Sequence, residues 1–202
     1  YFADPFVWQA SGHYYAVGTS RPGTENSLVF ALLRSPVLRN WEEVGGALVP
    51  PDPSLGGDFW APEVACHDGI FYMYYSVGFG DKHHHIRVAV SDNPAGPFRD
   101  TGTPLTTPDS VPFAIDAHAF RDDDGQWYLF HCRDFLERNA DGEVGTGLVV
   151  DRLVDMTRLA GDLRVVMRPR HPWQLFQAQR PMYGGVHDWH TLEGPTGSKH
   201  GG

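Results

Sequence analysis

Residues 3–18 read ADPFVWQASGHYYAVG, which is an acid followed by an apolar strand, a Ser-Gly turn and an aromatic strand. The same order recurs in residues 61–76, APEVACHDGIFYMYYS, and in residues 115–131, IDAHAFRDDDGQWYLFH. A fourth copy begins at residues 192–194, LEG, and the sequence ends before its aromatic strand. Such a repeat indicates one unit stacked along or around an axis, so that equivalent positions face the same place. We therefore expect the acids that head the copies to gather in one spot: Asp4, Glu63, Asp116 and Glu193.

Short segments rich in aromatic and β-branched residues predict β-strands, and no segment shows the apolar period of a helix. These segments are residues 14–17, 28–33, 71–75, 86–90, 127–130 and 147–150. Turns such as Asp68-Gly69 and Asp124-Gly125 predict hairpins between them. Radial repetition of four-stranded sheets gives a β-propeller, whose first strands line the axis. The sequence thus predicts an all-β fold with about three blades plus the start of a fourth, and residues 168–189 as a long loop on its open face.

The composition narrows the possible partners. The 202 residues suffice for a domain with a core, and their formal net charge of −9 without a basic stripe disfavours nucleic acid. No apolar run approaches the ~20 residues of a membrane-spanning helix, and no signal peptide is recognisable at the N-terminus. We expect a soluble protein, either cytoplasmic or secreted. Cys66 and Cys132 are expected to be half-buried free thiols, since two cysteines do not make a disulfide framework, and a disulfide between them is the alternative.

Gathered carboxyl groups suit the hydrolysis of a glycosidic bond. One carboxyl group protonates the leaving oxygen, and a second activates water or attacks directly. A third acid nearby raises the pKa of the proton donor by like-charge repulsion. Acids at the heads of successive blades could supply all three roles.

Four motifs together resemble glycoside hydrolase family 43. They are Asp-Pro-Phe at 4–6, Phe-Trp-Ala-Pro-Glu-Val at 59–64, Ile-Asp-Ala-His-Ala-Phe at 115–120 and His-Thr-Leu-Glu-Gly-Pro at 190–195. The resemblance covers nearly the whole chain, in the right order. It implies a five-bladed β-propeller, of which residues 1–202 form a partial catalytic domain. It also implies cleavage with inversion of terminal or side-chain pentose glycosides in plant-type oligo- or polysaccharides, as an α-L-arabinofuranosidase or β-xylosidase does.

The resemblance assigns roles to three acids. Asp4 corresponds to the general base, Asp116 to the acid that tunes and orients the proton donor, and Glu193 to the general acid. Ala117 after the middle acid is a mild departure from the family pattern. The resemblance requires no cofactor, although some relatives hold a structural Ca²⁺ on the propeller axis. It further implies that a second chain or a further C-terminal segment completes the propeller.

Six residues near the acids are candidates for contact with the sugar. Trp60 could stack on a sugar ring or belong to the core. Phe6 is expected to belong to the core, although it could also form a wall of the sugar pocket. Glu63 and the histidines could bind hydroxyl groups, and an arginine could anchor a hydroxyl or carboxylate. The full set is Trp60, Glu63, Phe6, His118, His190 and Arg133.

Three other functions compete with this interpretation. A glycan-binding propeller without catalysis would keep Trp60 and the pocket, and a truncated fragment could be inactive. A metal-dependent hydrolase using the eleven histidines lacks the His-x-x-x-His spacing of a zinc site. His83-His84-His85 alternates in direction and does not converge on one ion, so no metal ligand is assigned.

Overall fold

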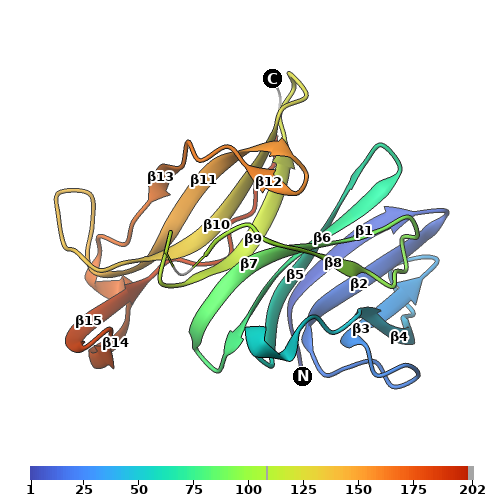
Figure 1. Cartoon of the computed structure of the whole chain (residues 1–202), viewed down its shortest axis with the longest axis horizontal. Coiled ribbons are helices and arrows are strands. Elements are labelled where there is room, and N and C mark those ends of the chain that lie inside the picture. The colour runs from blue at the N-terminus through green and yellow to red at the C-terminus, as the bar shows by residue number, and fades with distance from the viewer. Residues whose placement is uncertain (108, 200–202) are drawn as a thin grey trace.

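The computed structural model describes residues 1–107 and 109–199, and it is built almost entirely of β-strands (Figure 1). Its first two blades are antiparallel sheets whose strands pair in chain order. The first blade contains β1 (Phe2–Ala10), β2 (His13–Ser20), β3 (Val29–Ser35) and β4 (Glu42–Leu48). The short 3-10 helix η1 (Pro53–Leu55) leads to the second, which contains β5 (Asp58–His67), β6 (Ile70–Phe79), β7 (Lys82–Ser91) and β8 (Arg99–Pro104).

The third blade has the same plan with additions. It contains β9 (Ala114–Arg121), β10 (Trp127–Phe135), β11 (Gly145–Asp155), β12 (Arg158–Leu159) and β13 (Arg164–Met167), the last two both paired with β11. The expected long loop forms instead the 3-10 helix η2 (Pro172–Gln174) and a hairpin of β14 (Leu175–Met182) and β15 (Gly185–Thr191). Tyr183 and Gly184 form its two-residue turn with positive φ, as the preferred hairpin turns require.

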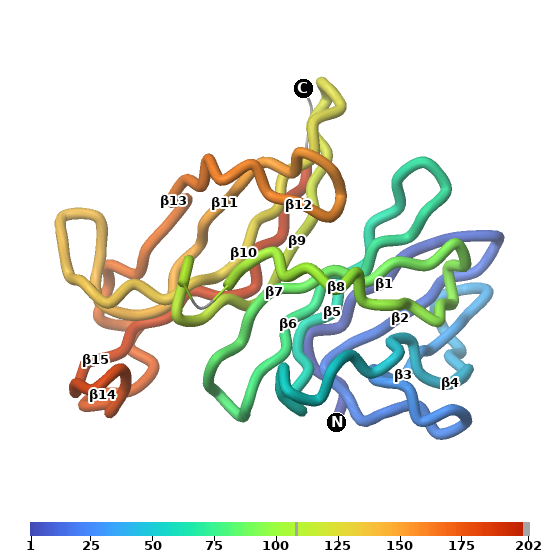
Figure 2. The backbone as a smooth tube through the Cα atoms, viewed as in Figure 1, coloured from blue at the N-terminus to red at the C-terminus, as the bar shows by residue number. Residues whose placement is uncertain are grey.

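The first strands of the blades lie side by side, β1 against β5 and β5 against β9 (Figure 2). Residues 192–199, where the fourth copy begins, carry no assigned strand but run along β9 in the same direction. Near the start of this segment the Gly194 amide bonds to Asp116, which is near the start of β9. Near the end of the segment Lys199 pairs at 2.6 Å with Asp123, which follows β9. The path of this segment therefore continues the series of inner strands.

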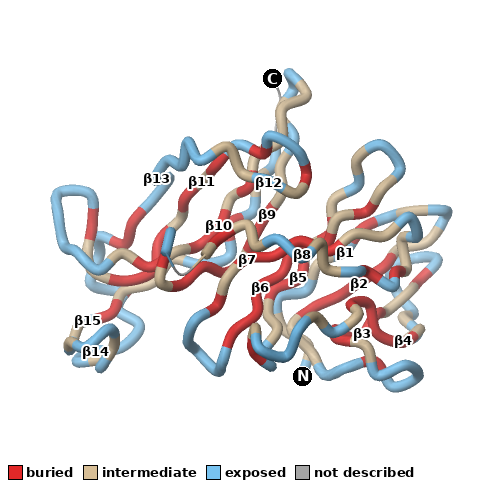
Figure 3. The backbone as a smooth tube through the Cα atoms, in the orientation of Figure 1, coloured by how far each residue is buried: buried red, intermediate tan, exposed pale blue. Residues whose placement is uncertain are grey.

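Two hydrophobic cores fill the spaces between neighbouring blades, and β6 serves both. Because side chains alternate along a strand, Met73 and Tyr75 pack toward the first blade while Tyr74 packs toward the third. Tyr74 donates a hydrogen bond of 2.8 Å to the carbonyl of Met156 across that second interface. Figure 3 shows the buried residues running through these central strands, whereas the β14–β15 hairpin is mostly exposed. The aromatic run of residues 71–75 thus fastens three blades together.

The three inner strands share a β-bulge. Asp4, Ala61 and Asp116 have φ values of 48°, 44° and 56°, and each begins a pair of residues that face a single residue on the next strand. Ala61, not Glu63, is therefore the structural equivalent of the two acids. Aspartate tolerates this left-handed conformation better than most residues, so two of the three bulges present a carboxyl group.

The remaining expectations about the chain concern membranes and thiols. No helix within residues 1–107 and 109–199 is long and apolar enough to cross a membrane. Both cysteines are free thiols, as the sequence predicts, but Cys66 is exposed and Cys132 is buried, so the expectation that they are half-buried is wrong.

Candidate active site

Asp4, Asp116 and Glu193 all line one cleft of about 400 Å³. Asp4 comes from the bulge of β1, Asp116 from the bulge of β9, and Glu193 from the segment after β15. The cleft is completed by β11 and the β14–β15 hairpin, which contribute Thr146 and Trp189. Three carboxyl groups from distant parts of the chain thus meet in one solvent-accessible hollow.

Asp116 is the most buried of these acids. Its Oδ2 accepts a 3.0 Å hydrogen bond from the Gly194 amide and lies 3.6 Å from the Cys132 sulfur. Burial raises the pKa of Asp116 to about 7, with further contributions from the charges of Glu193 and Asp4. Near neutral pH this carboxyl group therefore carries a proton part of the time.

Asp4 is held by a threonine that bridges two blades. Thr19 Oγ1 on β2 donates to Asp4 Oδ2 at 2.7 Å and accepts from the amide of Ala61 at 2.8 Å. The bulge of the second blade thus supplies a backbone donor rather than a carboxyl group. Through Thr19, that donor fixes the carboxylate of the first blade.

Glu193 is positioned by the parallel pairing of β15 with β11. Gly145 faces His190 and Thr146 faces Thr191, and the Leu192 amide donates to the carbonyl of Thr146 at 3.0 Å. A Cβ on Gly145 would collide with the carbonyl oxygen of His190, so the close approach requires glycine. Thr191 Oγ1 then donates to Glu193 Oε1 at 2.8 Å. These contacts set the position at which Glu193 enters the cleft.

A fourth carboxyl group, Asp134 on β10, also lines the cleft and was not identified from the sequence. It is 3% exposed, and its oxygens accept from Thr146 Oγ1 at 2.9 Å and from the Tyr183 hydroxyl at 2.6 Å. Burial raises the pKa of Asp134 to about 6. The signal in the sequence is weak, because Asp134 lies near the end of a strand that also carries His131 and Arg133.

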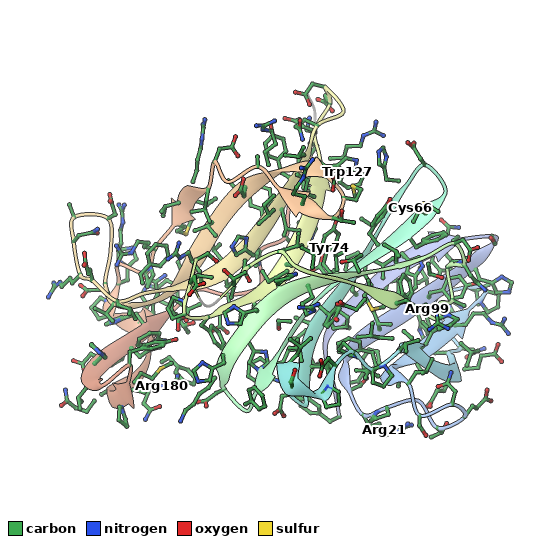
Figure 4. The ribbon with its side chains drawn as sticks, in the orientation of Figure 1. Arg21, Cys66, Tyr74, Arg99, Trp127 and Arg180 are labelled. Carbon is green, nitrogen blue, oxygen red and sulfur yellow. The ribbon has the colours of Figure 1, made fainter. Side chains whose placement is uncertain are left out.

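Aromatic and charged side chains form the walls of the cleft. Trp60 lines it, and one face of its ring stacks on His84 with 3.7 Å between the ring centroids. Arg180, which also lines the cleft, lies over Trp189 with 5.9 Å to the ring centroid. Arg180 also pairs at 2.8 Å with Asp81 in the β6–β7 turn, so the hairpin is tied to the second blade. Figure 4 labels Arg180 on this hairpin.

Three of the predicted sugar-contacting residues lie at one repeated position below the cleft. Phe6, Glu63 and His118 are each the first paired residue after a bulge. Phe6 packs on the core between the first two blades, and Glu63 bonds to His118 Nδ1 at 2.7 Å. None of the three lines the cleft; in the first and third blades the first residue of the bulge, Asp4 or Asp116, does so instead.

His190 and Arg133 also lie outside the cleft. His190 lines a separate groove together with Arg138 and Arg170, and its Nδ1 is 3.0 Å from the carbonyl of Asp188. The guanidinium of Arg133 lies over the ring of Phe135, and burial lowers its pKa. Of the six predicted sugar contacts, Trp60 alone lines the cleft within the described residues.

Within residues 1–107 and 109–199, no group of side chains suits the axial calcium ion that the family resemblance allows. In the part of the chain that the structure describes, no three His, Cys, Asp or Glu side chains are grouped to hold a metal. His84 of the histidine run is instead buried against Trp60, and its Nε2 is 2.8 Å from the carbonyl of Gly80. We therefore assign no metal to these residues.

Comparison with known proteins identifies relatives of this chain. A xylosidase/arabinosidase 43A of Humicola insolens is 38% identical over 78 residues, which cover 39% of this chain and 23% of that protein. A probable arabinan endo-1,5-alpha-L-arabinosidase A of Emericella nidulans is 33% identical over 129 residues, 60% of this chain and 38% of that protein. The chain spans less than two fifths of the length of these relatives.

The fold agrees with solved structures. The crystal structure of a thermostable family-43 glycoside hydrolase matches with a TM-score of 0.71 and 34% identity, over 86% of this chain and 55% of that one. The model of the glycosyl hydrolases family 43 matches residues 1–202. The three bulged inner strands, the cleft between them and these matches together show that the chain belongs to glycosyl hydrolases family 43.

Proposed function

We propose that this chain forms the catalytic face of a glycoside hydrolase that cleaves pentose glycosides with inversion. The observation that carries the proposal is the meeting of Asp4, Asp116 and Glu193 in one cleft, each in a different environment. Inverting hydrolysis requires a base and an acid in different protonation states at one pH, with a water molecule between base and sugar.

In this mechanism Asp4 is the general base. Its carboxylate accepts from Thr19 and lines the open cleft, so a free lone pair can accept a proton from water. Water then attacks the anomeric carbon from the face opposite the departing group. Glu193 is the general acid and delivers its proton to the leaving oxygen as the glycosidic bond breaks.

Asp116 helps to keep Glu193 protonated. It lies close enough to Glu193 for the two negative charges to repel, and ionising both carboxyl groups is therefore unfavourable. Its bond from the Gly194 amide also fixes the backbone directly after Glu193. Asp116 thus acts on both the protonation and the orientation of the proposed acid.

The substrate class follows from the walls of the cleft and the relatives. Trp60 provides an apolar ring face, and the carboxyl groups that line the cleft provide acceptors for sugar hydroxyl groups. The relatives are named as acting on arabinan or as xylosidase/arabinosidase enzymes. We infer α-L-arabinofuranosides or β-xylosides of plant-type oligo- or polysaccharides as substrates, with further residues or a second chain completing the propeller.

The test is turnover by this chain of methyl glycosides or oligosaccharides of α-L-arabinofuranose and β-xylose, because their leaving groups require protonation. Proton NMR of the first product should show the anomeric configuration opposite to that of the substrate. Glu193→Gln and Asp4→Asn should each lower kcat/KM by at least about 100-fold. Full activity of either variant would refute the role of that residue, and sugar binding without turnover by the parent chain would instead favour a glycan-binding propeller.

A further inference from the structure

Asp134 has an arrangement that the proposed proton transfer leaves unexplained. It is buried beside the cleft, and both of its hydrogen-bond donors are neutral hydroxyl groups, Thr146 Oγ1 and Tyr183 Oη. A buried carboxylate without a paired cation is costly to the fold. Such a residue is usually retained for a purpose other than stability.

The two donors lie at opposite ends of β15. Tyr183 belongs to the turn that precedes β15, and Thr146 faces Thr191, the last residue of that strand. Asp134 therefore bonds through Oδ2 to the turn before β15, and through Oδ1 to Thr146 of β11, which pairs with the end of β15. A single side chain on β10 fixes the strand that carries the chain to Glu193.

The contacts of Thr146 extend from Asp134 to the residues next to Glu193. Thr146 Oγ1 also accepts from Trp189 Nε1 at 3.3 Å, and its carbonyl accepts from the Leu192 amide. Thr191 in turn donates to Glu193 Oε1. A continuous series of hydrogen bonds and one backbone pairing thus links Asp134 to the carboxyl group of Glu193.

We propose that Asp134 is a positioning residue for Glu193, which it acts on by holding both ends of β15. This inference rests on the proposed function of Glu193 as the proton donor. Loss of the hold would leave Glu193 present but displaced, and a shift of about 1 Å at a reacting group can cost about 100-fold in rate.

Two substrates separate this role from a general structural one. The dinitrophenolate of a dinitrophenyl glycoside departs without being protonated, whereas the leaving group of a methyl glycoside or an oligosaccharide must receive a proton. Asp134→Ala should lower kcat/KM about 100-fold on the unactivated substrate and less than about 5-fold on the dinitrophenyl glycoside. Asp134→Asn should lose less, because its amide can still bond to both hydroxyl groups.

A second measurement does not depend on activity. The amides of His190 and Leu192 are held by the carbonyls of Val144 and Thr146. Asp134→Ala should raise their hydrogen-exchange rates at least about 10-fold, because a loosened β15 opens locally more often. Tyr183→Phe, which removes only one hydroxyl group, should give the same change in smaller measure and covers the case in which Asp134→Ala does not fold.

Asp151→Asn is the matched control. Asp151 on β11 is also a buried acid of the third blade, but it accepts from the Asp162 amide and does not line the cleft. It should change neither the ratio of activities on the two substrates nor the exchange of β15.

The outcomes distinguish the two proposals. If Glu193→Gln loses as much activity on the dinitrophenyl glycoside as on the unactivated substrate, Glu193 is not the proton donor and the proposed function fails. The hydrogen-exchange rates then still show whether Asp134 holds β15. If Glu193→Gln loses less activity on the dinitrophenyl glycoside but Asp134→Ala and Tyr183→Phe lower both activities equally, or leave the exchange of β15 unchanged, Asp134 does not position Glu193.

Discussion

The amide of Gly194 donates a 3.0 Å hydrogen bond to Oδ2 of Asp116, across 78 residues of sequence. Gly194 directly follows Glu193, so the backbone next to the Glu193 carboxyl group is fixed to the carboxyl group of Asp116. The same contact places a backbone donor against a carboxyl group whose pKa is raised to about 7. Any change at Asp116 should consequently affect both the position of Glu193 and the stability of the fold.

Asp116→Asn should be more stable than the parent chain at alkaline pH. The unfolded Asp116 loses its proton near pH 4, whereas the folded one keeps it to about pH 7, so the parent loses stability as pH rises through this range. The advantage of the variant should grow by up to about 4 kcal/mol between pH 4 and pH 8. Urea unfolding at the two pH values measures it, and an advantage independent of pH would contradict the assignment. Activity should fall in the same variant.

Thr19→Val should impair the site while keeping the shape of the side chain. It removes the donor to Asp4 and leaves the Ala61 amide without its acceptor, so we expect a loss of about 1 kcal/mol in stability and about 10-fold in kcat/KM. Thr19→Ser keeps the hydroxyl group and is the control. Equal activities of the two variants would show that the bridge has no role in positioning Asp4.

Trp60→Ala should weaken binding of the sugar more than it slows the chemistry. Its ring lines the cleft and carries none of the proposed proton transfers, so KM should rise about 10-fold with a smaller change in kcat. Trp173→Ala is the matched control, because Trp173 is 77% exposed and lies outside the cleft. A rise in KM for the control as large as that for Trp60→Ala would remove the assignment.

His131→Leu should protect the chain against acid. Burial lowers the pKa of His131 to about 4, so the unfolded chain takes up a proton near pH 6.5 that the folded chain still refuses. The parent therefore loses stability through His131 as pH falls from 6.5 to 4. The leucine variant should gain on the order of 2–3 kcal/mol relative to the parent over that interval. Thermal unfolding at pH 7 and pH 4.5 tests this, and parallel losses in both proteins would contradict it.

The gathering of Asp4 and Asp116 was predictable because both begin a repeated strand–turn–strand unit, and repeated units place their first residues alike. Glu63, by contrast, was wrongly expected at the equivalent position. The second copy has Ala61 and no acid at the bulge, so aligning the copies by their acids matched Glu63, two residues later, with Asp4 and Asp116. Asp4-Pro5 and Ala61-Pro62 carry the correct alignment in their shared proline.

The hairpin wall of the cleft escaped prediction for a different reason. Residues 168–189 lack a strong alternating pattern, and β15 is secured by a parallel pairing with Gly145 that only the folded chain brings about. Asp134 depends on that pairing as well, since one of its donors comes from the hairpin turn. Contacts made between distant segments leave little trace in local sequence.

The bulge at Ala61 shows that copies of one repeated unit can contribute different chemical groups to the same site. Three inner strands offer the same backbone turn toward the cleft, yet the middle one contributes its main chain and not its side chain. Because Ala61 is also buried, a small residue that preserves the turn can occupy that position. A fold assembled from copies in this way keeps a spare position at its centre, in which a new functional group could arise without disturbing those already in use.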